Sequence, residues 1–265
     1  VDASEGFQKD GPKNRLRERD IHRIVDGFLQ QREIPGFARM VTLEEIEKND
    51  FNLNLPRYID SRKQEDIQDL SGHLLGGIPE ADMAGLKTYW QVCPGLRDAL
   101  FCDLRPGYLK LTVPPEELRS TIFEHPEFIR LSEELGGLFS EFRKYQTPQL
   151  KALEAACAPK QVIFELSEAL LAHYQDLPLL DPYAVYQHLM DYWAEIMQDD
   201  VYLISAEGWK AEPSRILVAD KKGKMKDKGW ACDLVPKELV VNRYFAEERD
   251  ALRDLEAELE QMTAE

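Results

Sequence analysis

The feature that most constrains this fold is the recurrence of hydrophobic residues at helical spacing. Ile21, Ile24, Val25, Phe28 and Leu29 occupy positions i, i+3, i+4, i+7 and i+8, which predicts a helix over residues 15–31. Similar stripes within residues 128–142 and 162–170 predict two further helices whose apolar faces pack together. Only short segments, residues 37–41, 107–113, 201–204 and 215–218, favour strands. We therefore predict a mainly α fold, a bundle-like set of helices with small β elements.

Local signals place the shorter elements. Thr42 followed by Glu45 predicts a capped helix that ends at Asn49. Pro56 favours an extended chain over residues 51–60. Further helices are expected over residues 64–75, 80–91 and 94–102, and Asp181 before Pro182 predicts another helix start. Residues 221–229 read as a loop with five lysines.

Charge and cysteine content exclude several functions. Lys and Arg number 33 against 49 Asp and Glu, a net charge of −16, so nucleic acid could contact only local basic regions. No run of 18 apolar residues or secretory signal occurs, which predicts a cytoplasmic protein with no membrane contact. The cysteines lack zinc-ligand spacing and are interpreted as reduced thiols without a metal: Cys93, Cys102, Cys157 and Cys232.

Two basic patches stand out from the acidic background. The first patch has six members, Lys9, Lys13, Arg15, Arg17, Arg19 and Arg23. The second patch has five, Lys221, Lys222, Lys224, Lys226 and Lys228. Three arginines, Arg15, Arg17 and Arg19, and the five lysines are candidates for contact with a DNA backbone, since phosphates need only positive charge within reach. A solvated loop is the alternative for the lysines.

The last segment, residues 236–265, is predicted to be an amphipathic helix. Its hydrophobic residues hold spacings of seven, three, four and three, as in the seam of a coiled coil: Phe245, Leu252, Leu255, Leu259 and Met262. Most other positions are charged. This seam is the candidate partner-binding surface, although the helix could instead fold back onto its own domain.

No catalytic, cofactor-binding or metal-binding residues are predicted. Gly6 and Gly11 have the spacing of a phosphate-binding loop, but Pro12 interrupts it and Asn14 replaces the required hydroxyl. No Gly-x-Gly-x-x-Gly turn occurs. Asp181-Pro182-Tyr183 resembles the base-holding loop of amino-methyltransferases but lacks one proline, so a helix cap is the better interpretation. The five histidines are scattered, without a nucleophile context: His22, His73, His125, His173 and His188.

Residues 49–60, Asn-Asp-Phe-Asn-Leu-Asn-Leu-Pro-Arg-Tyr-Ile-Asp, resemble a segment of the methylase (M) subunits of type I restriction-modification systems. The motif positions are Asn52, Asn54, Pro56, Arg57 and Tyr58. The lead-in agrees at four places: Asp2-Ala3-Ser4, Asn14-Arg15-Leu16-Arg17, Phe37-Ala38-Arg39 and Glu44-Glu45-Ile46. Residues 76–79 and 187–208 resemble the C-terminal extension of one branch of these subunits more loosely.

The resemblance implies a parent that methylates adenine N6 in DNA with S-adenosylmethionine, partnered by a specificity (S) subunit and a restriction (R) subunit. Family members carry the cofactor and catalytic motifs upstream of this segment, so the chain is expected to be a C-terminal part that is not catalytic alone. Its expected divisions are the end of the methyltransferase domain with a connector (1–60), a helical domain with a small β section near 200–220 (61–235), and the amphipathic helix (236–265).

The expected function is docking to the S subunit, with DNA contact as an additional role. Two other classes remain open. One is a small stand-alone cytoplasmic enzyme with an unrecognised site, against which stands the absence of two catalytic groups in motif spacing. The other is a helical scaffold protein, against which stands the confinement of the heptad pattern to the last helix.

Overall fold

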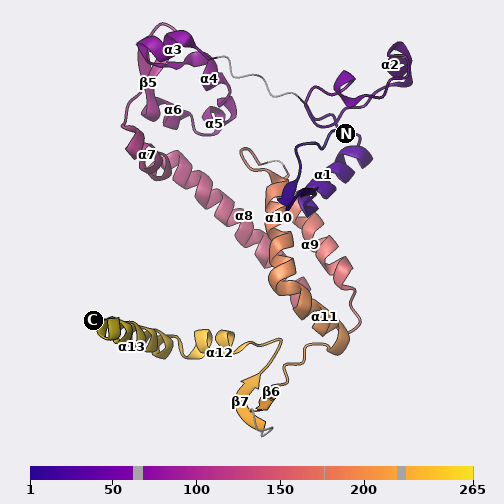
Figure 1. Ribbon diagram of the computed structural model, residues 1–265, viewed down its shortest axis with the longest axis vertical. Coiled ribbons are helices and arrows are strands. Elements are labelled where there is room, and N and C mark those ends of the chain that lie inside the picture. The colour runs from indigo at the N-terminus through magenta and orange to yellow at the C-terminus, as the bar shows by residue number, and fades with distance from the viewer. Residues whose placement is uncertain (62–67, 176, 220–224, 265) are drawn as a thin grey trace. The chain divides into compact units, whose positions relative to one another are not determined.

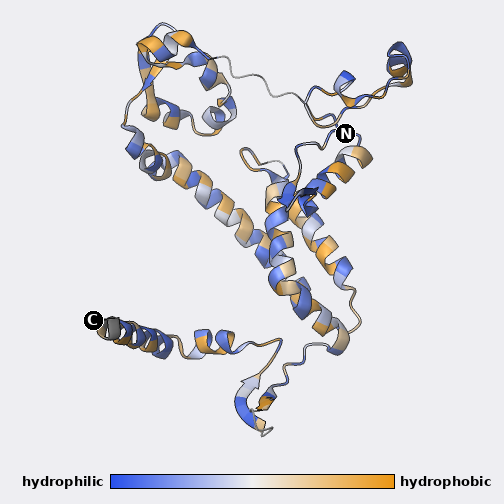
Figure 2. Ribbon diagram, in the orientation of Figure 1, coloured by the Kyte–Doolittle hydropathy of each residue, from blue (hydrophilic) through white to orange (hydrophobic). Residues whose placement is uncertain are grey.

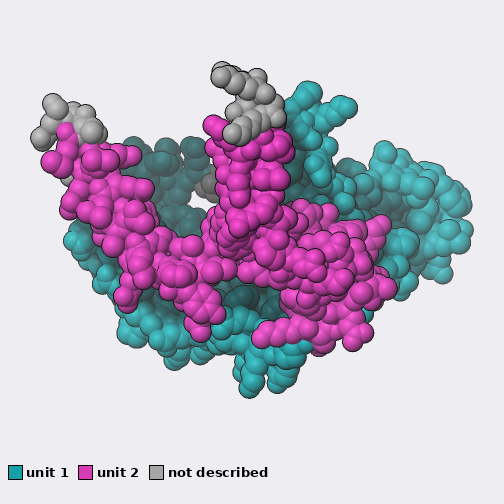
Figure 3. Space-filling model, turned by 90° about the horizontal axis from the view of Figure 1, so that it is seen from below, with its two compact units in different colours: residues 1–148, 165–191 teal, residues 149–164, 192–265 magenta. Residues whose placement is uncertain are grey.

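The computed structural model describes residues 1–61, 68–175, 177–219 and 225–264 (Figure 1). Two compact units divide the chain (Figure 3). Unit 1 comprises residues 1–148 and 165–191, and unit 2 comprises residues 149–164 and 192–265. Helices predominate, so the mainly α class with small β elements is confirmed. The expected divisions at residues 60 and 235 stay a prediction.

Unit 1 begins with a hairpin of β1 (Gln8–Asp10) and β2 (Lys13–Arg15). Asp10 pairs with Lys13, so Gly11 and Pro12 form the two-residue tip, and Gly11 has φ +59°. Glycine with positive φ at the first tip position is typical of hairpin turns. The two glycines that suggested a phosphate loop therefore belong to a hairpin and its approach, which supports rejecting that motif.

Helices α1 (Glu18–Leu29) and α2 (Leu43–Lys48) follow. The predicted cap of α2 is confirmed, because the Thr42 hydroxyl accepts a hydrogen bond from the Glu45 backbone N–H. The prediction of an extended chain over residues 51–60 is wrong in part. A short 3-10 helix, η1 (Leu55–Arg57), forms there because Pro56 is compatible with the first turn of a helix.

Residues 70–124 form a small α/β module in unit 1. Its elements are α3 (Leu70–Leu75), β3 (Ile78–Pro79), α4 (Glu80–Ala84), α5 (Lys87–Val92), α6 (Pro94–Leu100), β4 (Phe101–Arg105), β5 (Tyr108–Leu111), η2 (Pro115–Glu117) and α7 (Leu118–Glu124). The strands make an antiparallel sheet of order β3-β5-β4. Cys93, Leu96 and Leu100 are buried together beneath it.

This module corrects two predictions. The helix expected over residues 80–91 is two helices, α4 and α5, that separate around Gly85 and Leu86. The helix expected over residues 94–102 ends at Leu100, because Phe101 and Cys102 pair with β5 as the start of β4. The strand predicted over residues 107–113 is confirmed as β5. Strand pairing between distant residues cannot be inferred from local spacing, which explains the second error.

Long helices make up the remainder of unit 1 and begin unit 2. They are α8 (Pro126–Lys151), α9 (Pro159–Tyr174), α10 (Pro182–Tyr192), a π-helical turn η3 (Trp193–Met197) and α11 (Gln198–Glu207). In unit 1, the Phe142 ring of α8 lies 6.0 Å from the His173 ring of α9. The imidazole Nε2 of His173 also lies 2.9 Å from the Leu138 carbonyl oxygen. These contacts join α8 to the C-terminal end of α9, and the packing of the two stripes on each other stays a prediction.

The strand predicted over Val201–Ile204 is wrong, because these residues lie in α11. Val201 and Ile204 are 3% and 2% exposed. With Met197 they continue the i, i+4, i+7 spacing of a buried helical face, which outweighs the β preference of Val and Ile. In unit 2, α11 is held to residues 156 and 157 by two hydrogen bonds, Ala156 N–H to Ser205 O and Ser205 Oγ to Cys157 O.

Unit 2 continues with an antiparallel ribbon of β6 (Ser214–Ala219) and β7 (Met225–Ala231), which confirms the strand expected over residues 215–218. The loop expected over residues 221–229 is wrong from Met225 onward, where the chain is strand. Lys221, Lys222 and Lys224 lie outside the described residues.

The helix expected over residues 236–265 is two helices, α12 (Lys237–Tyr244) and α13 (Ala246–Ala264). The break falls at Phe245, whose φ of −136° is not helical. Among the described residues, no helix has the length and apolar character that a bilayer crossing needs. The four cysteines are free thiols.

The core of the small module yields a stability prediction. Leu100→Ala should lower the free energy of unfolding by about 2–5 kcal/mol, because the side chain is 3% exposed and its removal leaves a cavity. Leu74→Ala is the matched control, because the Leu74 side chain is 74% exposed. It should change the free energy of unfolding by less than about 0.5 kcal/mol. Urea denaturation followed by circular dichroism measures both. Equal effects would contradict the assignment of this core.

Candidate functional site

The motif at residues 49–60 is a compact loop that its own side chains shape. Asp50 and Phe51 have φ of +55° and +56°, so the chain reverses sharply after α2. The Asn52 side chain accepts a hydrogen bond from the Asn54 N–H at 3.0 Å. The Tyr58 hydroxyl donates to the Asn52 carbonyl oxygen at 2.6 Å and ties the two ends of the motif together. Asn52 and Tyr58 therefore have a structural role that the sequence did not reveal.

A neighbouring arginine joins this loop to α2. The Arg39 guanidinium donates two hydrogen bonds to the Glu45 carboxylate, at 2.9 and 3.0 Å, and a third to the Tyr58 carbonyl oxygen at 3.3 Å. Two parallel bonds to a carboxylate fix the planar guanidinium. Arg57, by contrast, is exposed on η1. Asn52 and Tyr58 thus shape the loop through side-chain hydrogen bonds, whereas Arg57 is exposed.

An arginine-lined cleft lies near the N-terminus of α1 in unit 1. Its volume is about 410 Å³, and Arg17, Arg19 and Arg23 are among its lining residues. The Arg23 guanidinium carbon lies 4.4 Å from the centre of the Phe37 ring, a cation–π contact. Asp2, Glu5 and Asp181 also line the cleft, so acidic and basic groups are mixed there.

Asp20 is the electrostatic centre of this cleft. Its carboxylate accepts hydrogen bonds from the Arg17 side chain at 2.8 and 3.1 Å and from the Arg17 backbone N–H at 3.0 Å, and the Arg19 Nε lies 3.8 Å away. Burial raises the pKa of Asp20, but these hydrogen bonds and charges outweigh burial and leave the pKa below its ordinary value. A Cβ at Gly6 would lie 3.2 Å from Asp20 Oδ1, so glycine permits this close approach.

These contacts determine where the first set of predicted DNA-contact residues lies. Arg17 and Arg19 are partly buried and face Asp20, and Arg17 occupies the N-cap position of α1, where its backbone N–H donates to the Asp20 carboxylate. Arg15 is exposed on β2. The structure therefore brings Arg17 and Arg19 together and leaves Arg15 outside the cleft. Their contact with DNA stays a prediction.

A polar network, here called the α1 joint, connects α1 with α9 and α10. The His22 ring nitrogen Nδ1 lies 3.1 Å from Asp26 Oδ2, and Nε2 lies 2.7 Å from Glu168 Oε1. The Tyr183 hydroxyl donates to Asp26 Oδ2 at 2.8 Å. The Tyr186 ring packs edge-on against the imidazole, with centroids 4.8 Å apart. Both imidazole nitrogens thus face carboxylate oxygens, at a site where His22 and Asp26 are mostly buried and Glu168 is 44% exposed.

Gln187 extends this joint along α10. Its side-chain oxygen accepts a hydrogen bond from the Arg19 backbone N–H at 3.1 Å, and its amide nitrogen donates to Glu18 and Asp191. An N–H in the first turn of a helix has no partner within the helix. Gln187 therefore caps α1 from another helix and fixes how the two pack.

The predicted helix cap at Asp181 is confirmed, because its carboxylate accepts a hydrogen bond from the Tyr183 N–H at 3.0 Å. Tyr183 lies in the first turn of α10 and points to Asp26. Burial, together with the hydrogen bond to the Asp26 carboxylate, raises the pKa of Tyr183 to about 12. The structure therefore uses this tyrosine in the α1 joint.

The seam of α13 is exposed. Leu252, Leu255 and Met262 are 60%, 62% and 77% exposed, and Leu259 also lies on this face. Figure 2 shows hydrophobic residues recurring among hydrophilic ones along the helix. Phe245 precedes α13 at the break and is exposed as well. Four of the five predicted partner-binding residues thus lie on one helix, and Phe245 lies outside it.

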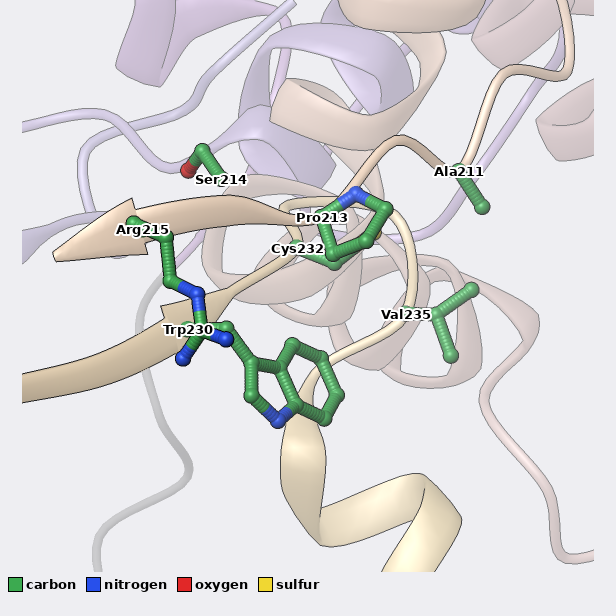
Figure 4. Close-up of a pocket in the computed structure, with 7 residues that line it drawn as sticks. All are labelled: Ala211, Pro213, Ser214, Arg215, Trp230, Cys232 and Val235. Carbon is green, nitrogen blue, oxygen red and sulfur yellow. The ribbon is translucent and has the colours of Figure 1, made fainter.

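Two residues of the second basic patch, Lys226 and Lys228, lie on β7 and are exposed. At the base of the ribbon is an apolar slot of about 430 Å³ (Figure 4). Pro213, Trp230 and Val235 line it, and the Arg215 side chain extends toward Trp230. The Lys237 Nζ lies 5.4 Å from the Trp230 ring centre. This slot was not predicted, because it combines residues from both sides of the ribbon.

Comparison with known proteins bears on the first quarter of the chain. Residues 1–67 match the family described as N-6 DNA Methylase. The resemblance to type I methylase subunits is confirmed over this segment. We call residues 1–67 the methylase segment. It contains the motif loop, the arginines of the cleft, and His22 and Asp26 of the α1 joint.

Relatives are similar over a stretch of comparable length. The Type I restriction enzyme MjaVII methylase subunit of Methanocaldococcus jannaschii is 44% identical over 61 residues, 23% of this chain and 11% of the relative. The MjaVIII methylase subunit of the same organism is 35% identical over 57 residues, 22% of this chain and 10% of the relative. The MpnII methylase subunit of Mycoplasma pneumoniae is 29% identical over 70 residues, which are 26% of this chain and 13% of the relative.

The chain therefore covers only about a tenth of the length of the curated relatives that it matches. No solved structure matches. The family match defines the methylase segment, and α8 to α13 lie outside it.

The described residues do not fit S-adenosylmethionine, the methyl donor expected of such a family. Nucleotide-like cofactors bind where glycine-rich turns follow parallel strands. The sheets of the described residues are antiparallel, of two or three strands, and the cleft beside the methylase segment is lined by arginines. Within the described residues, no cluster of three His, Cys, Asp or Glu side chains could hold a metal ion.

The lowered pKa of Asp20 predicts a pH dependence. A carboxyl group whose pKa falls on folding stabilises the fold above its unfolded pKa, about 3.8, and loses this contribution as the pH falls through the folded value. Asp20→Asn should therefore destabilise the protein by about 1–3 kcal/mol at pH 7. The free energy of unfolding of Asp20→Asn and of wild type should be measured by denaturation across pH ~2–7. The difference between the two should shrink below pH ~4. A difference that grows with acidity would contradict this assignment.

The α1 joint predicts a second effect. Tyr183→Phe removes the hydroxyl that donates to Asp26 and should lower the free energy of unfolding by about 1–2 kcal/mol at neutral pH. Because the pKa of Tyr183 is raised to about 12, this contribution should be complete below pH ~10 and disappear as the pH approaches 12. Tyr145→Phe is the control, because Tyr145 is exposed on α8. Equal losses from both substitutions would argue against the joint.

Proposed function

We propose that this chain is an assembly region of a type I restriction-modification methylase subunit, which docks to the specificity subunit through α13. The whole protein would methylate adenine N6 in DNA with S-adenosylmethionine, alongside a restriction subunit. The match of residues 1–67 to the N-6 DNA Methylase family supports this context.

The exposed seam of α13 is the observation that carries the docking role. Leu252 and Leu255 are one turn apart on a helix of 19 residues, and both are more than half exposed. Single exposed leucines are ordinary, but a row at a/d spacing is the pattern that one helix presents to another. Covering this row with a partner helix removes apolar surface from water, at about 25 cal/mol per Å².

The charges of α13 indicate what kind of helix fits there. Residues 246–264 contain seven acidic and two basic residues. Two copies of this helix would therefore repel each other, whereas a helix with Lys or Arg beside its own apolar seam would be attracted. The proposed contact is thus between different subunits rather than between copies of this chain.

The α1 joint supports an assembly role for the helices that it connects. Through it the methylase segment contacts α9 and α10 by side-chain hydrogen bonds within unit 1. Such contacts would hold the helical region to the methyltransferase domain in the intact protein. DNA contact belongs to the same proposal, with the exposed Lys226 and Lys228 as the described candidates.

The docking role predicts a position-specific effect. Leu255→Asp should weaken binding to the cognate specificity subunit by about tenfold or more, because it places a charge in the apolar seam. Ala257→Asp adds the same charge two residues away, on another face of α13, and should leave binding nearly unchanged. Both positions are exposed, so neither substitution should disturb folding. Gel filtration and isothermal titration calorimetry of the purified subunits measure the effect.

Identical binding by wild type and Leu255→Asp would remove α13 from the interface. Loss of binding in both variants would show that added charge alone, rather than the seam, controls association. Circular dichroism of each variant checks that the helix content is unchanged.

A further inference from the structure

The β6–β7 ribbon has two distinct faces, which its register defines. Val218 pairs with Lys226, while Leu217 pairs with Asp227 and Ala219 pairs with Met225. Paired residues share a face, and alternate residues along a strand share a face. Lys226 and Lys228 therefore lie on one face, here called the lysine face. Arg215 pairs with Trp230 and forms an ion pair with Asp227 at 3.4 Å, so these residues lie on the opposite, tryptophan face.

A bulge in β7 produces this separation. From Arg215 to Leu217 the register advances by two residues on β6 but by three on β7, from Trp230 to Asp227. The extra residue shifts the alternation, so Trp230 turns away from the lysine face. Gly229 lies in the bulge with φ +106°, and a Cβ there would approach the Lys237 Nζ at 3.4 Å. Glycine is therefore required for this geometry.

Both faces carry positive charge. The lysine face has Lys226 and Lys228, and the tryptophan face has Arg215 with Lys237 beside the Trp230 ring, against Asp227. The described residues of the ribbon, 214–219 and 225–231, contain three basic residues and one acidic residue, in a chain whose net charge is −16. The acidic Glu212 and Asp233 lie outside the two strands. The ribbon is thus a local basic element that would attract a polyanion.

The exposure of the ribbon indicates a partner that encloses it. Every residue of β6 is exposed, including Ile216, Leu217 and Val218, and a lone two-stranded ribbon is only marginally stable in water. A partner with negative charge on two sides would meet both faces at once. The walls of a DNA groove have this arrangement, because a phosphate backbone runs along each side.

The thickness of the ribbon fits one of the two DNA grooves. A β layer with its side chains is about 10 Å thick. The major groove of B-form DNA is about 12 Å wide and admits a two-stranded ribbon, whereas the minor groove is about 6 Å wide. We propose that the β6–β7 ribbon inserts into the major groove of duplex DNA, with Lys226 and Lys228 toward one phosphate backbone and Arg215 and Lys237 toward the other.

This inference deepens the DNA-contact part of the proposed function and does not require the specificity subunit. The full chain should bind a 20-base-pair DNA duplex of mixed sequence. Fluorescence anisotropy of the labelled duplex measures the affinity from about 50 to 200 mM salt. Lys226→Glu with Lys228→Glu should weaken binding by about tenfold and lower the slope of log affinity against log salt by about two. Lys237→Glu, on the other face, should lower the slope by about one.

Matched controls separate the ribbon from general charge. Lys144→Glu with Lys151→Glu makes the same change of charge on α8, where both side chains are exposed, and should leave binding nearly unchanged. Gly229→Val keeps every charge but cannot adopt the bulge easily, and should weaken binding. Methyl green, a major-groove ligand, should displace the protein, whereas distamycin, a minor-groove ligand, should not.

The opposite results overturn the inference. Equal losses from the ribbon and α8 variants, or full affinity in Gly229→Val, would mean that charge alone causes binding. An unchanged slope in Lys237→Glu would contradict contact on both faces, and displacement by distamycin would place the protein in the other groove. Absence of binding by the wild-type chain would refute the ribbon site and leave docking through α13 intact, because that role is measured with the specificity subunit.

Discussion

The arrangement of α1, α9 and α10 depends on the contacts that the His22 imidazole makes. It lies between carboxylates of Asp26 on its own helix and Glu168 on another, and Tyr183 from a third helix completes the network through Asp26. Polar groups that are covered from water must be paired, since an unsatisfied group costs about 1–3 kcal/mol. Each member of the joint therefore constrains the others, and the three helices can pack in few other ways.

Local signals allowed much of the fold to be predicted, and distant contacts account for the errors. The caps at Thr42 and Asp181 depend on residues two or three positions away and were correctly identified. His22 was not assigned a role, because its partner Glu168 lies 146 residues away. Val201 and Ile204 were assigned to a strand on their β preference, although burial on α11 decides their conformation. The bulge at Gly229, which creates the two ribbon faces, has no sequence signature stronger than the glycine itself.

The arginines at the start of the chain show that basic residues grouped in a sequence can be paired with carboxylates in the fold instead of being available at the surface. Arg17 and Arg19 were grouped with other basic residues as candidates for phosphate contact, but both face Asp20 in the folded protein. Arg17 uses its side chain and backbone N–H to hold one carboxylate, so its first task is to fix the start of α1. Lys226 and Lys228 differ, since the strand holds them in the open.

The shortness of the α13 seam has a kinetic consequence. Leu252 to Met262 spans about three helical turns, roughly 16 Å at 1.5 Å per residue. A contact of that length buries much less than the roughly 800 Å² per partner of a standard stable interface. A complex held by this helix alone would exchange its subunits readily. A long-lived assembly would need a second point of attachment, whose effect would multiply with that of α13 through the raised local concentration of the two subunits.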